Sequence, residues 1–374
     1  MTTRTEMDST PEETPATANG IERRVPSRPP FRVGPFSFVR RPVMVLLTLA
    51  MVVSLFLVAC VNIGRGDFPL SIPQVVDVLF GGGSRIDRFI VMDLRLPRSL
   101  TGLLVGVALG MSGAVTQSIA RNSLASPDIL GITAGASAAA VALIVLGGGG
   151  TFVGVLATLG LPLAALVGGV STAVAIYGLA WKRGVEGFRL ILVGIAINAM
   201  LTASIGWLLI SADINDVSRA QLWLNGSLNG ADWSTVWPVL GAIILVGGVT
   251  IVSTFTLGAM RLGDDNARSL GVRLQHGQAT LLLAAVALAA IATAAAGPIG
   301  FVALAAPQIA LRILRTPGPP ILASAIMGGL LVVGSDLIAR TVLPVELPVG
   351  IVTSALGGPF LLYLLVRSNR KVSA

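Results

Sequence analysis

The chain has 374 residues, of which 54% are hydrophobic and only 12% are charged. Soluble globular proteins carry about 25% charged residues, so this composition excludes an ordinary soluble domain. The formal net charge of +8 comes from basic residues scattered between apolar segments, which argues against a nucleic-acid-binding surface.

The first segment, residues 1–42, is polar and rich in Pro, Thr and Arg. Such a composition buries too little apolar surface to fold alone, so we predict a disordered N-terminal tail. The segment lacks the apolar stretch of a cleavable signal peptide, so we predict none before the first span.

Apolar runs of about 20 residues follow from residue 43 onward, and each is long enough to cross a bilayer as a helix. They predict an all-α polytopic membrane protein with about ten transmembrane helices. The fourth run contains Pro162 and is long, so we expect a kink or a start outside the bilayer. The eighth is short and contains Pro307. The predicted spans are roughly 43–63, 98–119, 129–147, 153–181, 189–210, 236–258, 279–296, 300–316, 319–339 and 349–367.

An even number of spans places both termini on one side of the membrane. Of the 26 Lys and Arg residues, 19 fall on that side and 7 on the other. Basic residues concentrate in cytoplasmic loops, so both termini are predicted to be cytoplasmic. The transmembrane domain then covers residues 43–370 with a cytoplasmic loop at 259–278, and residues 371–374 form the cytoplasmic C-terminal end.

Several residue types needed for catalysis are absent. Neither lysine, Lys182 or Lys371, follows a glycine, so a Walker A motif for ATP hydrolysis cannot be formed. His276 is the one histidine and Cys60 the one cysteine, which excludes a zinc-protease motif, an intrachain disulfide and a cysteine-built metal site. We expect no enzymatic activity and no cofactor in this chain.

The stretch Gly110–Gly113, GMSG, matches the serine motif of rhomboid-type intramembrane proteases. That chemistry needs a base beside the serine, and His276 lies in a polar loop. Gly102, Gly106 and Gly110 recur every four residues and form one helix face, so close helix packing is the favoured interpretation.

Intramembrane charge is sparse: Asp128 begins the third span and Asp336 lies late in the ninth. Ion-coupled transporters usually keep ionisable groups at mid-membrane, so an ion-coupled secondary transporter is the alternative hypothesis. Asp336 and Arg340 are one turn apart, and we favour a structural ion pair between them.

Arg95 and Arg98 flank Pro97 at the non-cytoplasmic start of the second span, and Arg340 ends the ninth span on that side. Their spacing of three projects Arg95 and Arg98 to one side of a helix. Charge placement alone favours simple anchoring of helix ends at the interface.

The polar loop 259–278 contains DDNARSLG, in which Asp264 or Asp265 can cap a short helix and Gly271 can end it. An exposed short helix can fit a groove on a partner protein. From periodicity alone, this interpretation and an ordinary solvated loop are equally good.

Five ordered stretches together resemble one family of transport proteins. They are residues 95–137 (RLPRSL…ITAGAS), 222–233 (LWLNGSLNGADW), 262–275 (LGDDNARSLGVRLQ), 296–312 (AGPIGFVALAAPQIALR) and 336–365 (DLIARTVLPVELPVG…LLYLL). Their order and spacing resemble the FecCD family of permeases, which serve binding-protein-dependent ABC importers of iron-siderophores, haem and cobalamin. The resemblance covers residue 43 to the end. It departs from the usual family pattern at residues 122–127 (NSLASP), 307–309 (PQI) and 316–320 (TPGPP).

The resemblance implies a fold of ten helices with inverted repeats in helices two to five and seven to ten. It also implies a permease subunit of a multi-pass transporter in the bacterial cytoplasmic membrane, surrounded by lipid and importing an iron-siderophore. The implied partners are a second permease subunit, identical or homologous, two ATPase subunits that bind ATP and Mg²⁺, and an extracytoplasmic substrate-binding protein.

The resemblance also implies roles for particular residues. Arg95, Arg98 and Arg340 match family arginines that dock acidic residues of the binding protein. The family's ATPase-coupling element matches Ala267, Arg268, Ser269, Leu270 and Gly271. For the pathway, the second span offers Met111, Ser112, Val115 and Gln117, which cannot all share one helix face, and helix packing is at least as good an interpretation for each.

Overall fold

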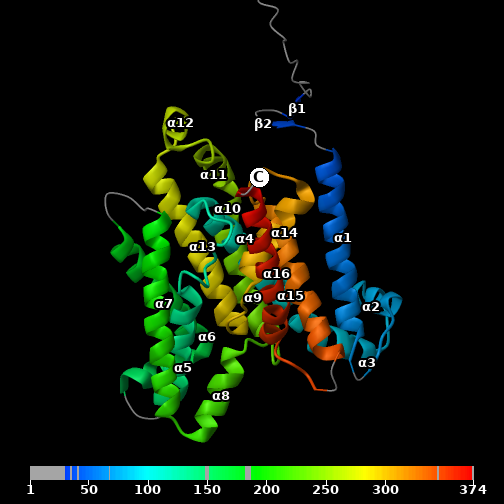
Figure 1. Ribbon diagram of the computed structural model, residues 1–374. Helices are drawn as coiled ribbons and strands as arrows, with labels where there is room; N and C mark the ends of the chain where they lie inside the picture. Colours follow the sequence, from blue (N-terminus) through cyan, green and yellow to red (C-terminus); the bar gives the residue numbers. More distant parts are fainter. Residues whose placement is uncertain are drawn as a thin grey trace, which may run out of the picture. The chain divides into compact units, whose positions relative to one another are not determined.

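The computed structural model describes residues 30–33, 36–39, 42–66, 68–147, 151–181, 187–342 and 345–372 (Figure 1). The chain divides into two compact units, Met1–Val45 and Leu46–Ala374. In the first unit, β1 (Pro30–Val33) and β2 (Phe36–Val39) pair antiparallel, with Pro30 opposite Val39. This hairpin lies inside the segment predicted to be disordered, and residues 1–29 of that prediction fall outside the described residues.

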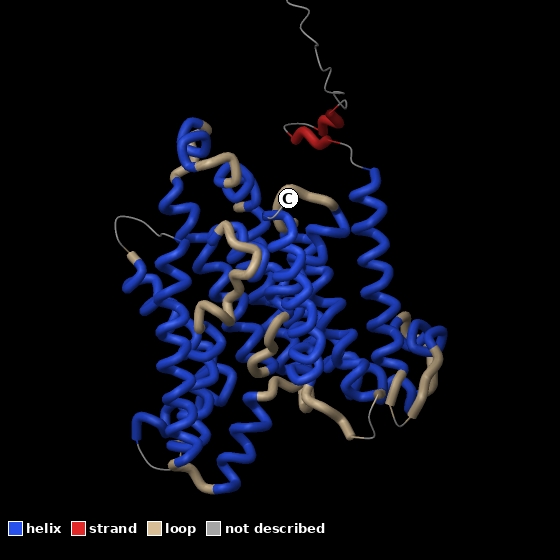
Figure 2. The backbone as a smooth tube through the Cα atoms, viewed as in Figure 1, coloured by secondary structure: helices blue, strands red, loops and turns tan. Residues whose placement is uncertain are grey.

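The described residues of the second unit form helices joined by loops and turns, as Figure 2 shows. Among the residues that the structure describes, eight helical segments, the first of which begins in the first unit, are long and apolar enough to cross a membrane, and two shorter apolar helices accompany them. Together they account for each of the ten predicted spans. In chain order these elements are α1 (Pro42–Gly64), α4 (Leu96–Ala120), α5 (Ile132–Leu146), α6 (Thr151–Ala180), α7 (Gly187–Ile210), the run α9 (Trp233–Ala242), η2 (Ile243–Gly247), α10 (Gly248–Val252) and α11 (Thr254–Met260), then α13 (Leu274–Ala296), α14 (Val302–Leu314), α15 (Ile321–Thr341) and α16 (Val349–Val372).

Short elements mark the two ends of the bundle. One end, here called the α12 end, carries α12 (Asp264–Ser269). The opposite end, here called the α8 end, carries α8 (Ile214–Leu224), α2 (Ile72–Leu79), α3 (Arg85–Arg88) and the π-helical segment η1 (Phe89–Arg95) that leads into α4 (Figure 1).

The two shorter apolar helices replace spans that the sequence predicted to be longer. α5 begins at Ile132, after a non-helical stretch that starts at Arg121, and α14 has 13 residues. The predicted distortion of the fourth span is confirmed, because the helix α6 is broken at Gly160, with φ 81° and ψ 163°, two residues before Pro162. A proline lacks the N–H that an uninterrupted helix would need at that position.

α4 is the central helix of the bundle and packs against α13, α14 and α15. Its residues from Leu104 to Gln117 are almost all buried, and Val105 and Leu109 lie in the largest apolar cluster. The predicted close approach of helices at the glycine face is confirmed. A methyl group added at Gly106 would meet the carbonyl of Gly328 in α15, and one added at Gly110 would meet that of Ser324. Small residues are what allow two backbones to come this close.

The only cysteine of the sequence, Cys60 in α1, is buried, with 1% of its surface exposed. It lies one turn before the end of α1, in the part of that helix whose residues are buried.

Candidate docking and coupling sites

A buried carboxylate, that of Asp336 in α15, joins three helices. Its Oδ1 accepts hydrogen bonds from Nη2 and Nε of Arg98 in α4, at 2.9 and 3.2 Å. Its Oδ2 accepts one from Nδ2 of Asn62 in α1, at 3.0 Å, and lies 3.4 Å from Nε of Arg340. The predicted pair of Asp336 and Arg340 is therefore confirmed, and a second arginine shares the same carboxylate.

Asn62 completes the connection between α1, α4 and α15. It is fully buried, and its Oδ1 accepts hydrogen bonds from Ser99 Oγ at 2.8 Å and Arg340 Nη2 at 2.6 Å. The same Nη2 also donates to the backbone carbonyl of Asn62 at 2.8 Å. Buried charges are stable only when paired and hydrogen-bonded, and here neutral and charged groups together supply the partners. We call Asn62, Arg98, Asp336 and Arg340 the arginine cluster.

One further acid reaches this cluster from outside. Glu346, in the segment just before α16, has its Oε2 3.5 Å from Arg98 Nη1. Its side chain is 57% exposed, against 14% for Arg98 and 2% for Asp336. The guanidinium of Arg98 thus has one side bound to a buried acid and another turned toward an exposed one.

Arg95 binds different acceptors. Its Nη1 donates to the carbonyl of Ile63 and its Nη2 to that of Phe68, both at 2.9 Å. A cation at the last carbonyls of α1 is favourable, because those groups lack partners within the helix. The sequence predicted that Arg95 and Arg98 would project to one side; the structure directs Arg95 to the end of α1 and Arg98 to α15. Their role in docking stays a prediction, and the structure adds that all three predicted arginines hold contacts within the chain.

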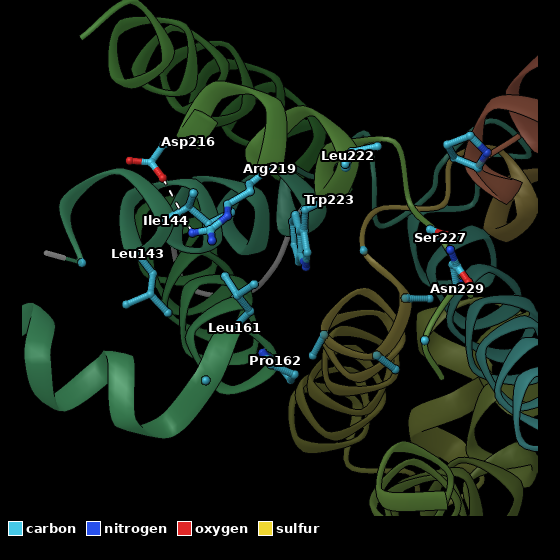
Figure 3. A pocket seen from close by; sticks show the side chains of 18 of the residues that line it. Leu143, Ile144, Leu161, Pro162, Asp216, Arg219, Leu222, Trp223, Ser227 and Asn229 are labelled. Carbon is cyan, nitrogen blue, oxygen red and sulfur yellow. Dashed lines mark hydrogen bonds and ion pairs between the residues drawn. The ribbon is translucent and has the colours of Figure 1, made fainter. Parts of the chain in front are cut away.

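A cleft of about 1480 Å³ adjoins the arginine cluster and is lined by Arg98 and Glu346. Apolar residues also line this cleft, among them Leu143, Leu161 and Pro162. Figure 3 shows Trp223 and Arg219 projecting from α8 over Leu161 and Pro162, with Asp216 paired to Arg219. A cleft lined by both charged and apolar side chains can receive a partner that carries both kinds of surface.

At the α12 end, the predicted short helix is present. α12 ends in a Schellman turn, in which the N–H of Val272 donates to the carbonyl of Ala267 and that of Gly271 to Arg268. Gly271 has φ +78°, which glycine adopts without strain, so the prediction that it ends the helix is confirmed. The predicted aspartate cap is wrong, since Gly263 occupies the N-cap and Asp264 is already the first helical residue.

This turn fixes what α12 presents to its surroundings. Ala267 is fully buried and packs with Met260 and Leu274, and Val272 packs against the same group. Leu270, at the C-cap, is 56% exposed, and Arg268 and Asp265 form an exposed pair at 3.5 Å. The predicted coupling segment is therefore a hydrogen-bonded turn, packed through Ala267, with an exposed leucine at its tip.

Arg261 connects this loop to the transmembrane helices. Its Nη2 donates to Ser118 Oγ in α4 at 3.1 Å and to the carbonyl of Pro319, before α15, at 2.8 Å. Partial burial lowers the pKa of its guanidinium, which remains charged at neutral pH. The contact ties the end of α11, three residues before α12, to α4 and to the segment that precedes α15.

The four candidate pathway residues lie in the interior of this chain. Met111, Ser112, Val115 and Gln117 are at most 3% exposed. Ser112 Oγ donates to the carbonyl of Ala285 in α13 at 2.5 Å. Gln117 donates through Nε2 to the carbonyl of Leu304 and accepts through Oε1 from Nε2 of Gln308. Their pathway role remains untested, and the contacts seen are those of helix packing.

Sequence reasoning missed Asn62 and Glu346. Asn62 is an isolated polar residue two positions before the end of an apolar helix, and this is the one feature of the sequence that could have indicated a buried polar contact there. Glu346 lies between two prolines in a short connection, where an acid is an ordinary surface residue. Their partners lie far away in sequence, so no periodic pattern points to them.

Comparison with known proteins agrees with this architecture. The model of the FecCD transport family matches residues 52–367. The chain is 40% identical to the ferric enterobactin transport system permease protein FepG of Escherichia coli (strain K12), with 87% of this chain and 97% of FepG covered. It is 38% identical to the iron(3+)-hydroxamate import system permease protein FhuG of Bacillus subtilis (strain 168), with 88% and 98% covered.

A solved structure shares the fold. It is described as a metal-chelate type ABC transporter in an inward-facing conformation, and it matches with a TM-score of 0.73 at 24% identity, covering 86% of this chain and 99% of the other. The helices observed at the ten predicted spans, the five ordered motifs and the near full-length match point to the same conclusion. The chain belongs to the FecCD transport family.

Proposed function

We propose that this chain is the membrane permease subunit of an ABC importer that carries a ferric siderophore into the bacterial cytoplasm. The observation that carries the proposal is the family match over residues 52–367. Relatives at 38–40% identity, named as ferric enterobactin and iron-hydroxamate permeases, support the cargo class. ATP and Mg²⁺ bind to partner ATPase chains, because this sequence contains no Walker A lysine.

The distribution of basic residues supports a cytoplasmic position for the α12 end. In this orientation α12 meets the ATPase subunits through the exposed tip at Leu270, and Arg261 relays its position to α4 and α15. The α8 end then faces out, with the arginine cluster and its cleft available to a substrate-binding protein.

Docking at the α8 end uses electrostatic complementarity. Basic residues usually concentrate on the cytoplasmic side of a membrane protein, but Arg95, Arg98 and Arg340 lie at the opposite end. Their position supports a role in attracting acidic residues of the binding protein. Because Arg98 and Arg340 are largely buried, with 14% and 9% of their side chains exposed, Arg98 is the arginine better placed for direct contact through its outward edge.

Transport assays test the function. Cells with and without this chain are given ⁵⁵Fe-loaded catecholate or hydroxamate siderophore, and we expect uptake only when the chain is present. Haemin and cobalamin serve as competing cargoes; import of either in place of the ferric siderophore would contradict the cargo assignment.

Energy coupling separates the importer from an ion-coupled transporter. In proteoliposomes that contain the chain, its partner subunits and the binding protein, import should require ATP and be blocked by vanadate. A protonophore should leave it unchanged. Import that follows an imposed ion gradient without ATP would overturn the proposal.

A further inference from the structure

The Arg98 guanidinium has two chemically different sides. Nε and Nη2 face Asp336 Oδ1, a carboxylate with 2% of its side chain exposed. Nη1 faces Glu346, whose side chain is 57% exposed and whose Oε2 lies 3.5 Å away. One side is therefore fixed in the interior, while the other makes a long contact accessible to solvent.

Backbone contacts hold Glu346 in this place. The next residue, Leu347, donates its N–H to the carbonyl of Ala339 in α15 at 3.1 Å. Gly350, at the start of α16, donates to the carbonyl of Gly226 at 3.1 Å. The carboxylate is thus presented to Arg98 just before two residues whose backbones are tied to the bundle.

The charges balance only when Glu346 is included. Arg98 and Arg340 carry two positive charges and Asp336 carries one negative charge, so the arginine cluster alone has a net charge of about +1 at neutral pH. Glu346 neutralises that remaining charge. With Glu346 seated, the arginine cluster and Glu346 are together neutral and Arg95 is the cation that remains nearby; without Glu346, an approaching acidic protein meets one more positive charge.

We propose that Glu346 is a built-in competitor for docking: it occupies the side of Arg98 at which a carboxylate of the substrate-binding protein binds, and that carboxylate displaces it. This inference rests on the proposed function and deepens it. The partner chemistry is an acidic side chain, Asp or Glu, on the surface of the binding protein that faces the cleft.

Displacement at this side is energetically easy and at the other side is not. An exposed ion pair contributes about 0–1 kcal/mol, so an incoming carboxylate with good geometry can replace Glu346. Removing Asp336 from its two arginines would leave buried charge without a partner. The partner therefore exchanges with Glu346 and leaves the arginine cluster intact.

The test compares docking in charge-matched variants. The importer, assembled with its second permease subunit and ATPase subunits in nanodiscs, is mixed with fluorescently labelled substrate-binding protein of the same import system, at low and high salt. Glu346→Gln removes the competitor. Asp213→Asn is the matched control, since Asp213 lines the same cleft, stands at the N-cap of α8 without a side-chain capping bond, and is replaced by an equally good capping residue.

We expect Glu346→Gln to raise the association rate or affinity up to about fivefold at low salt, and Asp213→Asn to change it clearly less. Arg98→Lys keeps a positive charge beside Asp336 but removes Nη1, the nitrogen that faces Glu346. It should weaken docking, and adding Glu346→Gln to it should bring no further gain. Thermal unfolding of each variant verifies that the bundle is intact.

The outcomes distinguish the competitor role of Glu346 from the docking role of Arg98. If docking of the unmodified chain is salt-sensitive and Arg98→Lys weakens it, but Glu346→Gln has no effect, the competitor role is overturned and docking at Arg98 stands. Equal acceleration by Glu346→Gln and Asp213→Asn also overturns it, because only the long-range field is then involved. If neither salt nor Arg98→Lys changes the association rate or affinity, the proposed docking face is overturned, and the competitor role of Glu346 with it.

Discussion

Asp336 joins three helices, α1, α4 and α15, at the α8 end of the structure. It is the shared anion of two largely buried arginines, and it also accepts a hydrogen bond from Asn62. Asp336→Asn would leave both guanidinium groups without their buried counter-charge. We expect this variant to lose about 3–5 kcal/mol of unfolding free energy, measured by denaturant titration in detergent micelles.

Glu346→Gln is the control at the same cluster, because it removes only the exposed partner of Arg98. Its stability should change by less than about 1 kcal/mol. Equal effects of the two variants would contradict the distinction between a structural acid and a replaceable one.

Only part of this cluster could be predicted from sequence. Asp336 and Arg340 are one helical turn apart, so their pairing followed from helix geometry. Arg98 and Asn62 lie 238 and 274 positions from Asp336, and their contacts arise from the packing of three separate helices. A single sequence gives no register between distant helices, so Arg98 appeared free for a partner although it is bound to Asp336 within the chain.

Among the elements, the α4–α15 contact depends on glycines at which the two backbones meet. A methyl group at Gly328 would meet the carbonyl of Gly106, whereas one at Gly334 on the same helix has no atom within 4 Å. Gly328→Ala should therefore destabilise the bundle by about 1–3 kcal/mol. Gly334→Ala should be neutral or stabilising by up to about 1 kcal/mol, because alanine favours helix. Thermal unfolding of both variants in one detergent gives the comparison, and a similar loss in both would refute the steric explanation.

The α12 turn gives a prediction about coupling. Leu270→Asp places a charge at the exposed tip without touching the buried Ala267, so ATPase co-purification and transport should fall while thermal stability is kept. Gly271→Ala forces a left-handed conformation on alanine at a cost of about 1–2 kcal/mol and should shift the tip instead.

Asp265→Asn is the surface control for α12, since the Asp265 side chain is 99% exposed and pairs only with its neighbour Arg268 in the ion pairs described. It should retain ATPase association. Normal association of Leu270→Asp would show that the exposed leucine is not part of the contact.

Element positions followed well from the sequence where apolar runs were long. Each predicted span has its helix, and Pro162 correctly marked the distorted fourth span, although the break itself lies at Gly160. The short extent of α5 and α14 was less predictable, because apolar loop residues such as Leu130 and Ile299 are buried and extend the apolar run beyond the helix. The π-helical segments η1 and η2 depend on tertiary packing and have no sequence signature.

At the scale of the whole molecule, the composition and the missing Walker A motif determine what the chain does alone. Purified to homogeneity in detergent, it should show no ATP hydrolysis above background. Hydrolysis should appear once the partner ATPase subunits are added, measured as phosphate release. Sustained ATP hydrolysis by the isolated chain, retained after removal of every contaminating ATPase, would contradict the assignment of hydrolysis to the partner subunits.

The burial of Cys60 has a practical consequence for spectroscopy. A bulky maleimide reagent in water should reach a thiol that is 1% exposed very slowly. A cysteine introduced at an exposed position such as Leu270 or Glu346 could then be labelled selectively without first replacing the natural one. Paired labels on the α12 tip and beside Arg98 would report distances between the two ends of the bundle throughout a transport cycle, in a chain that otherwise keeps its native sequence.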